Sequence, residues 1–65
     1  MFLVFYRTND VFEAEELLSN AGVDTEIVPT PVQDIAYCGE CIKIKKEDAD
    51  RAAKALKMKE YKRVE

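Results

Sequence analysis

Apolar and polar residues alternate along this chain with two different periods, which divide it into strands and helices. Residues 2–7 are large apolar side chains closed by an arginine, which predicts a buried central strand. Within residues 23–28, Val23, Thr25 and Ile27 alternate with the acids Asp24 and Glu26, which is the period of a half-exposed strand. Residues 42–45 alternate isoleucine with lysine and predict a third strand. Residues 61–64 predict a short fourth strand, whose basic residues suit the edge of a sheet.

Two segments between these strands carry apolar residues at helical spacing. The first begins near Thr8, where Thr8 or Asp10 could cap the helix and Asp10 with Glu13 fits a capping box. It ends at Gly22, because glycine readily adopts the left-handed conformation of a helix C-cap. The second begins with acids and ends with bases, the order that the helix dipole favours. The positions expected to face the core are Val11, Ala14, Leu17, Leu18 and Ala21 in the first helix, and Ala49, Ala52, Ala53 and Leu56 in the second.

The order strand, helix, strand, strand, helix, strand predicts an α+β, ferredoxin-like fold in one domain of residues 1–65. This fold is a four-stranded antiparallel sheet with two helices on one face. Its first and second strands run parallel, with the third between them. The other face carries no helix, and alternate side chains of residues 2–6 must supply apolar groups to it. An apolar face of this kind commonly forms an interface, so the sequence predicts a homodimer.

A long loop joins the second and third strands and leads into both cysteines of the chain. Residues 29–31, Pro-Thr-Pro, stop the second strand because proline has no N–H to donate to a sheet, and the loop then runs to Glu40. Neighbouring elements are usually joined by about 4–6 residues, and longer connections are often functional. The cysteines lie in the stretch Cys38-Gly39-Glu40-Cys41. The predicted topology puts Cys38 at the end of the sheet where the first helix begins.

Composition and charge exclude several classes of protein. The net charge of −3, with acids and bases interspersed, gives no cationic stripe for a phosphate backbone, so we expect no nucleic-acid partner. The apolar residues 1–6 are too few for a signal-peptide core or a membrane span, so we expect a cytoplasmic protein without a membrane partner. In a reducing compartment, two cysteines three positions apart are more typical of catalytic, redox or metal-binding chemistry than of a structural disulfide.

The two thiols differ in their expected surroundings. A thiol acts as a nucleophile or a sulfur carrier only as the thiolate, which requires a favourable potential and access to a partner. Cys38 meets both conditions, because Gly39 permits a sharp turn with exposed amides and the nearby helix start adds positive potential. Three acids oppose this potential: Asp10, Glu13 and Glu40. Cys41 opens the third strand, where it could resolve a bond formed at Cys38 or pack as a small apolar residue.

Besides thiol chemistry at Cys38, the same residues fit two other functions: a dimeric CxxC metal-binding or regulatory module, and a plain interaction domain. A closed zinc site needs four ligands, and the chain has two sulfurs and no histidine, so Cys38 and Cys41 could bind zinc or an iron–sulfur cluster only across a dimer. The chain could also be a plain interaction domain whose cysteines pack. A thioredoxin-like enzyme is disfavoured, because there the CxxC motif opens a helix. If Cys38 instead acts as a thiol carrier, we expect no cofactor.

Over its whole length the sequence resembles the selenium/sulfur carrier-like family of small domains. The resemblance rests on the apolar first strand, on Glu15-Glu16-Leu17-Leu18 with Ala21-Gly22-Val23, and above all on Pro29-Thr30-Pro31 followed by Cys38-Gly39. It departs from the family at residues 34–37, which are bulkier than the usual small residues before Cys-Gly, and at the start of the second helix, which lacks a serine or threonine cap.

The resemblance implies a role for Cys38. This thiol would carry sulfur or selenium as a persulfide or selenosulfide, taken from a protein donor and passed to a protein acceptor, while Gly39 shapes the turn. The protein would then be a carrier and not an enzyme. Cys41 has no counterpart in the resemblance, so its role as a resolving thiol rests on spacing alone.

Overall fold

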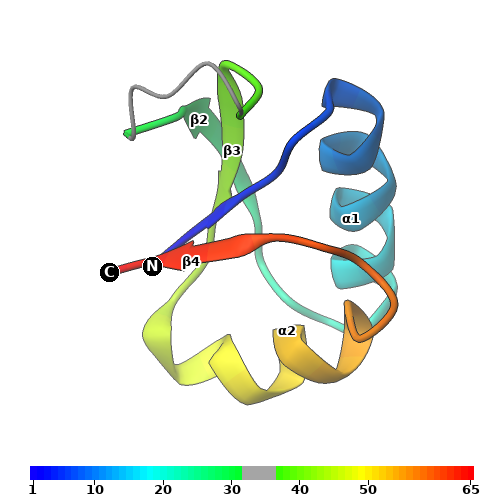
Figure 1. Ribbon diagram of the computed structural model, residues 1–65. Helices are drawn as coiled ribbons and strands as arrows, with labels where there is room; N and C mark the ends of the chain where they lie inside the picture. The colour runs from blue at the N-terminus through cyan, green and yellow to red at the C-terminus, as the bar shows by residue number, and fades with distance from the viewer. Residues whose placement is uncertain (32–36) are drawn as a thin grey trace.

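The computed structural model describes residues 1–31 and 37–65, which fold as a ferredoxin-like α+β structure (Figure 1). The elements are β1 (Phe2–Val4), α1 (Thr8–Asn20), β2 (Glu26–Pro29), β3 (Glu40–Lys43), a single 3₁₀ turn η1 (Lys46–Asp48), α2 (Ala49–Ala55) and β4 (Lys62–Val64). The strand order is β2-β3-β1-β4, and each pair of neighbours is antiparallel. This confirms the predicted fold class, with β3 between the parallel strands β1 and β2.

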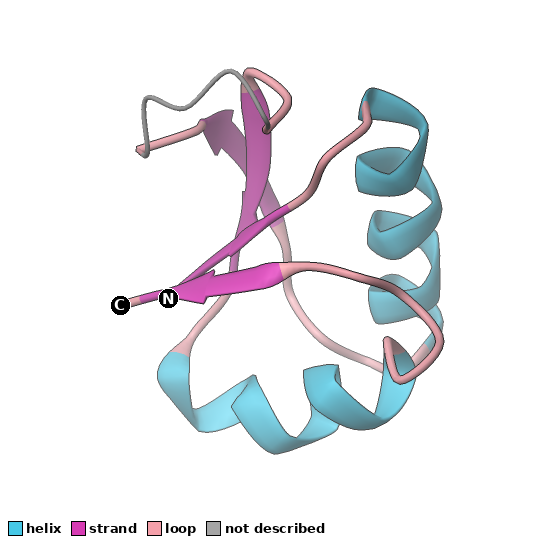
Figure 2. Cartoon of the chain, in the orientation of Figure 1, coloured by secondary structure: helices cyan, strands magenta, loops and turns pink. Residues whose placement is uncertain are grey.

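The core lies between the sheet and the two helices, which pack against the same face (Figure 2). Leu3 pairs with Ile42 across β1 and β3, and both side chains point to this face. The buried residues of the cluster are Leu3, Phe5, Val11, Ala14, Leu18, Val23, Ile42, Ile44, Ala52 and Leu56. The apolar residues of the strands and those of the helices therefore form one layer. Packing in this layer aligns the ends of β1, β2 and β3.

The C-terminal end of α1 has the left-handed glycine, Gly22, that the sequence predicted. Gly22 has a φ of +80°, the left-handed region that favours glycine. Its N–H donates to the Ser19 carbonyl at 3.0 Å, and the Val23 N–H donates to the Leu18 carbonyl at 2.9 Å. Val23 and Leu18 are both buried in the core. These are the two hydrogen bonds and the apolar contact of a Schellman motif.

The start of α1 differs from the prediction. β1 ends at Val4 and not at Arg7, because its pairing with β3 and β4 stops there. Arg7 occupies the N-cap position in an extended conformation, and no side chain caps the helix. The predicted caps at Thr8 or Asp10 and the capping box of Asp10 with Glu13 are therefore wrong, since the Asp10 carboxylate faces the Arg7 side chain at 3.4 Å.

The bounds of β2 and β3 and three core positions also differ from the prediction. β2 begins at Glu26, because Val23 is used in the C-cap of α1, and β3 begins at Glu40 and ends at Lys43. Ala49 and Ala53 were expected in the core but are half-buried outside its cluster, whereas Ala55 packs against it. Leu17 was also expected in the core but is 40% exposed. Consecutive residues of a helix point about 100° apart, so the buried stripe that includes Leu18 turns Leu17 toward solvent.

The sheet face opposite the helices is less exposed than the sequence predicts. Val4 and Cys41 are direct partners in the β1–β3 register and lie on this face, and both are completely buried in a single chain. Phe2, Val28 and Val64 are half-buried. The centre of the sheet face that was expected to form a dimer interface is therefore already covered within one chain. The homodimer stays a prediction. No helix in the described part of the chain is long and apolar enough to cross a membrane.

Candidate thiol site

Thr30 closes the loop between β2 and β3 with two hydrogen bonds, one from its backbone N–H and one from its side-chain hydroxyl. The last pair of the ladder is Pro29 with Glu40, and the next residue along, Thr30, donates its N–H to the Gly39 carbonyl at 3.0 Å. The Thr30 hydroxyl then donates to the Cys38 carbonyl at 2.7 Å. The threonine between the two prolines therefore fixes the backbone of the thiol residue, a role that the sequence analysis did not assign to it.

The other side of Cys38 is attached to the residue that follows β1. Its N–H donates to the carbonyl of Phe5 at 3.0 Å, two residues before the N-cap of α1. Cys38 therefore lies at the end of the sheet where α1 begins, as the topology predicted. With its carbonyl bound to Thr30 and its N–H bound to Phe5, the residue is held between the ends of two strands.

The Cys38 side chain is partly accessible. It is half-buried against the edge of the core, and Sγ donates to the Glu40 carbonyl at 2.9 Å. Gly39 beside it has no positive φ, and a Cβ built there would meet no atom within 4 Å among the described residues other than its two chain neighbours. The backbone of Gly39 therefore does not itself demand glycine, and no described residue outside its chain neighbours occupies the place of the missing side chain.

Cys41 has the opposite environment. It is completely buried between Val4 and Val28, its partners on the two neighbouring strands, and Sγ lies 3.8 Å from the Pro29 carbonyl. Burial raises the pKa of the Cys41 thiol, and repulsion from Cys38 raises it further. Cys41 is therefore disfavoured as a thiolate while β3 is intact.

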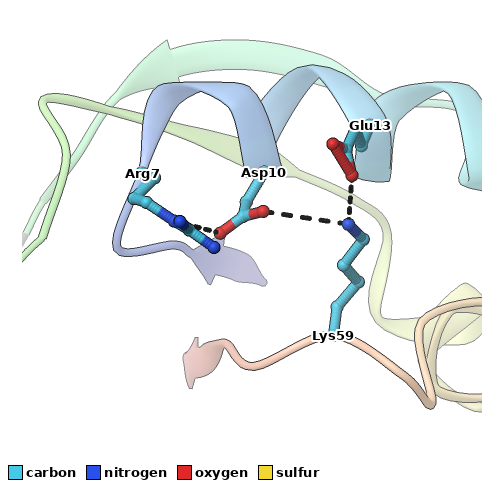
Figure 3. A network of polar contacts seen from close by, with 4 residues as sticks. All are labelled: Arg7, Asp10, Glu13 and Lys59. Atoms are coloured by element: carbon cyan, nitrogen blue, oxygen red, sulfur yellow. Dashed lines mark hydrogen bonds and ion pairs between the residues drawn. The ribbon is translucent and has the colours of Figure 1, made fainter.

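Two of the three acids that opposed a reactive thiol in the sequence, Asp10 and Glu13, are paired with bases in the structure (Figure 3). Lys59, from the segment between α2 and β4, reaches α1 and contacts Asp10 at 3.8 Å and also Glu13. The Asp10 carboxylate contacts Arg7 on its other side. The hydrogen bond to Glu13 raises the pKa of Lys59, so this charge persists at neutral pH. The network therefore offsets the negative potential of α1 at the Cys38 end of the sheet.

An aromatic pair flanks the thiol segment. The ring of Tyr37, the residue before Cys38, stacks on the ring of Tyr6 with centroids 5.0 Å apart, and the Lys62 Nζ lies 5.8 Å from the Tyr37 centroid. From sequence these tyrosines are most simply core or interface residues. The signal that could have found them is the position of Tyr37 directly before Cys38.

Metal ligands are sparse in the part of the chain that the structure describes. It contains no group of three or more cysteine, aspartate or glutamate side chains placed to hold a metal ion. The predicted alternative of a cluster shared by two copies would also require Cys41 to leave its buried position.

Comparisons with known proteins agree with the resemblance seen in the sequence. Residues 1–63 match the family described as "Putative Se/S carrier protein-like". Neither the curated proteins nor the solved structures gave a significant match. The matched range covers every described strand and helix except the last residue of β4, Val64, and it includes the Thr30 and Cys38 positions that meet at the end of the sheet. The chain therefore belongs to the Se/S carrier protein-like family.

Proposed function

We propose that this protein carries sulfur or selenium on Cys38 and relays it between protein partners. The observation that carries the proposal is the contrast in access between the two thiols: Cys38 is half-exposed and held at a sheet end, whereas Cys41 is completely buried. A carrier must receive its cargo from one protein and give it to another, so its thiol has to be reachable by both. Family membership supports this class of function.

The proposed loading step is a thiol exchange. The Cys38 thiolate attacks the outer sulfur of a persulfide on the donor protein, so a new S–S bond forms at Cys38 Sγ while the donor's S–S bond breaks. The donor cysteine leaves as a thiolate. Any proton on the outer sulfur moves with that sulfur to Cys38. Delivery repeats this step with an acceptor thiolate. Selenium would follow the same course through a selenosulfide.

The residues around Cys38 have supporting roles in this proposal. Ionisation of the thiol breaks the contact of Sγ with the Glu40 carbonyl, since only the S–H form can donate a hydrogen bond. The open space beside Gly39 gives the incoming sulfur room. Cys41 would act as a resolving thiol only when the end of β3 opens: its attack on Cys38 Sγ would form a disulfide and release hydrosulfide, and a dithiol reductant would restore the pair.

The proposed setting is the cytoplasm, where Cys38 remains reduced between transfers. The expected partners are a protein donor and a protein acceptor of sulfur or selenium. Turnover of a small-molecule substrate by the isolated chain is not part of the proposal.

The test is loading followed by delivery. Reduced protein is exposed to a persulfide donor, freed of donor and examined by intact mass, and it is then mixed with an acceptor thiol. Wild type and Cys41→Ala should gain the mass of one sulfur atom and lose it to the acceptor, whereas Cys38→Ser should not gain it. Alanine is chosen at position 41 because a serine there would bury a hydroxyl. An adduct of equal yield in Cys38→Ser would disprove the assignment.

A further inference from the structure

The stack of Tyr6 and Tyr37 brings a lysine to the thiol segment. The rings lie at 27° to one another, and the ammonium of Lys62 lies over the face of Tyr37, the geometry of a cation–π contact. Tyr6 is 46% exposed and Lys62 is exposed, so an incoming molecule can reach both. We call Tyr6, Tyr37 and Lys62 the tyrosine–lysine group.

This group lies on the same sheet face as Cys41 and at the end of β1 that holds Cys38. Lys62 is the partner of Val4 in the β1–β4 register, and Cys41 is the partner of Val4 in the β1–β3 register, so Lys62 and Cys41 share a face. Tyr37 is joined by one peptide bond to Cys38, whose N–H is bound to Phe5. The chain therefore places the ammonium and the reactive thiol around the same end of β1.

The charge of Lys62 is available to a ligand. Lys62 forms no ion pair within residues 1–31 and 37–65, in contrast to Arg7, Lys59 and other bases of this chain. A side-chain hydrogen bond with Tyr37 raises the pKa of Tyr6. The Tyr6 hydroxyl therefore stays neutral at physiological pH and does not cancel the ammonium.

A positive charge at this place would help the proposed transfer. The Cys38 thiolate and the persulfide or selenosulfide anion of a donor are both negative, so they repel one another as they approach. An ammonium near both of them reduces this repulsion. It does so without entering the exchange of bonds, so the residues of the group are positioning and specificity residues.

We propose that Tyr6 and Tyr37 hold the Lys62 ammonium beside Cys38, where it favours sulfur or selenium donors whose reacting group is an anion. The inference rests on the proposed carrier function, to which it adds the charge of the group that Cys38 accepts. It assigns a role to three residues that the thiol chemistry itself does not use.

The experiment measures the charge preference of Cys38 with simple probes. In a Cys41→Ala background, Cys38 is reacted under the same conditions with a dicarboxylate aromatic disulfide and with a neutral dipyridyl disulfide, and the ratio of the two rates is taken. Lys62→Gln should lower the ratio about threefold, and Lys62→Arg should restore it, because a surface charge acts over roughly 10 Å at moderate ionic strength. Tyr6→Leu should lower the ratio although Lys62 is still present.

Arg63→Gln is the matched control. It removes the same charge from the adjacent position of β4, whose side chain points to the opposite face of the strand, and it should leave the ratio unchanged. An equal decrease in Arg63→Gln would show that only net charge matters, and an unchanged ratio in Lys62→Gln would also overturn the inference. The probes react with any accessible thiol. A normal charge preference with no persulfide loading would therefore reject the carrier function alone, and loading without a charge preference would reject only the inference.

Discussion

Cys38 and Cys41 are three residues apart and differ in almost every physical property that governs a thiol. Cys38 lies where the loop meets the sheet, half-exposed, beside a glycine and fixed by hydrogen bonds to two strands. Cys41 lies inside β3 between two valines, fully buried, with a raised pKa. The difference teaches that a CxxC motif entering a strand need not be a pair of equivalent thiols, because one thiol lies before the strand and the other lies inside it, between two neighbouring strands.

The largest expected effect concerns accessibility. In Cys38→Ser, the remaining Cys41 should react with a neutral alkylating reagent about 100-fold more slowly than Cys38 reacts in Cys41→Ala, since β3 must open before Cys41 meets solvent. The rates are followed by intact mass. In concentrated urea the two variants should react at similar rates. Similar rates in the folded state would remove the contrast between the thiols.

The pH dependence of Cys41 should sharpen the same contrast. Burial raises the pKa of this thiol, so in Cys38→Ser its alkylation rate should still increase with pH above about 9.5, roughly one unit above the pKa of an ordinary thiol, where the rate of an ordinary thiol approaches its plateau. In the unfolded state the thiol ionises at lower pH, so this group favours unfolding as pH rises through that range. The rate–pH profile in buffer is compared with the profile in urea. Coincident midpoints would contradict a buried Cys41.

A smaller effect is expected from loosening the Cys38 backbone. Thr30→Val removes the hydroxyl that donates to the Cys38 carbonyl and keeps the branched shape of the side chain. It should lower the free energy of unfolding by about 1 kcal/mol, the usual contribution of one hydrogen bond. Urea unfolding measures the change, and hydrogen exchange of the Cys38 amide should become faster.

The control for Thr30→Val is Thr25→Val, a half-buried threonine next to the other end of β2. An equal loss of stability in both variants would mean that the Thr30 hydroxyl does not fix the turn.

The smallest effect should come from the ion pairs of α1. Lys59→Gln removes the base that contacts Asp10 and Glu13, so thermal stability at neutral pH should decrease slightly. Glu13 raises the pKa of Lys59 above its ordinary 10.5. The stabilisation is therefore complete below that pH and is lost as pH rises through the raised value.

Thermal unfolding of wild type and Lys59→Gln at neutral and at strongly alkaline pH checks this, with the exposed Lys54→Gln as control. A difference between wild type and Lys59→Gln that does not shrink at alkaline pH would show that the Lys59 charge is not its source. A decrease in Lys54→Gln as large as that in Lys59→Gln would show that any lysine of this surface has the same effect.

The sequence by itself determined the fold and the location of Cys38. The period of two in the strands, the helical spacing of Val11, Ala14 and Leu18, and the left-handed glycine at Gly22 are local properties, and all appear in the structure. Strand order then puts the β2–β3 loop and the start of α1 at one end of the sheet. The Thr-Pro and Cys-Gly motifs pointed to the family that the comparison found.

Only the tertiary structure decided which groups meet. The sequence left Cys41 open between a reactive and a packed thiol, because its burial depends on strands that flank it from distant parts of the chain. The pairing of Asp10 with Lys59 and the stack of Tyr6 on Tyr37 join residues 31 to 49 positions apart. Local periodicity states which face of an element is apolar, but burial, ion pairing and ring stacking depend on which other elements approach that face, and folding alone sets that arrangement.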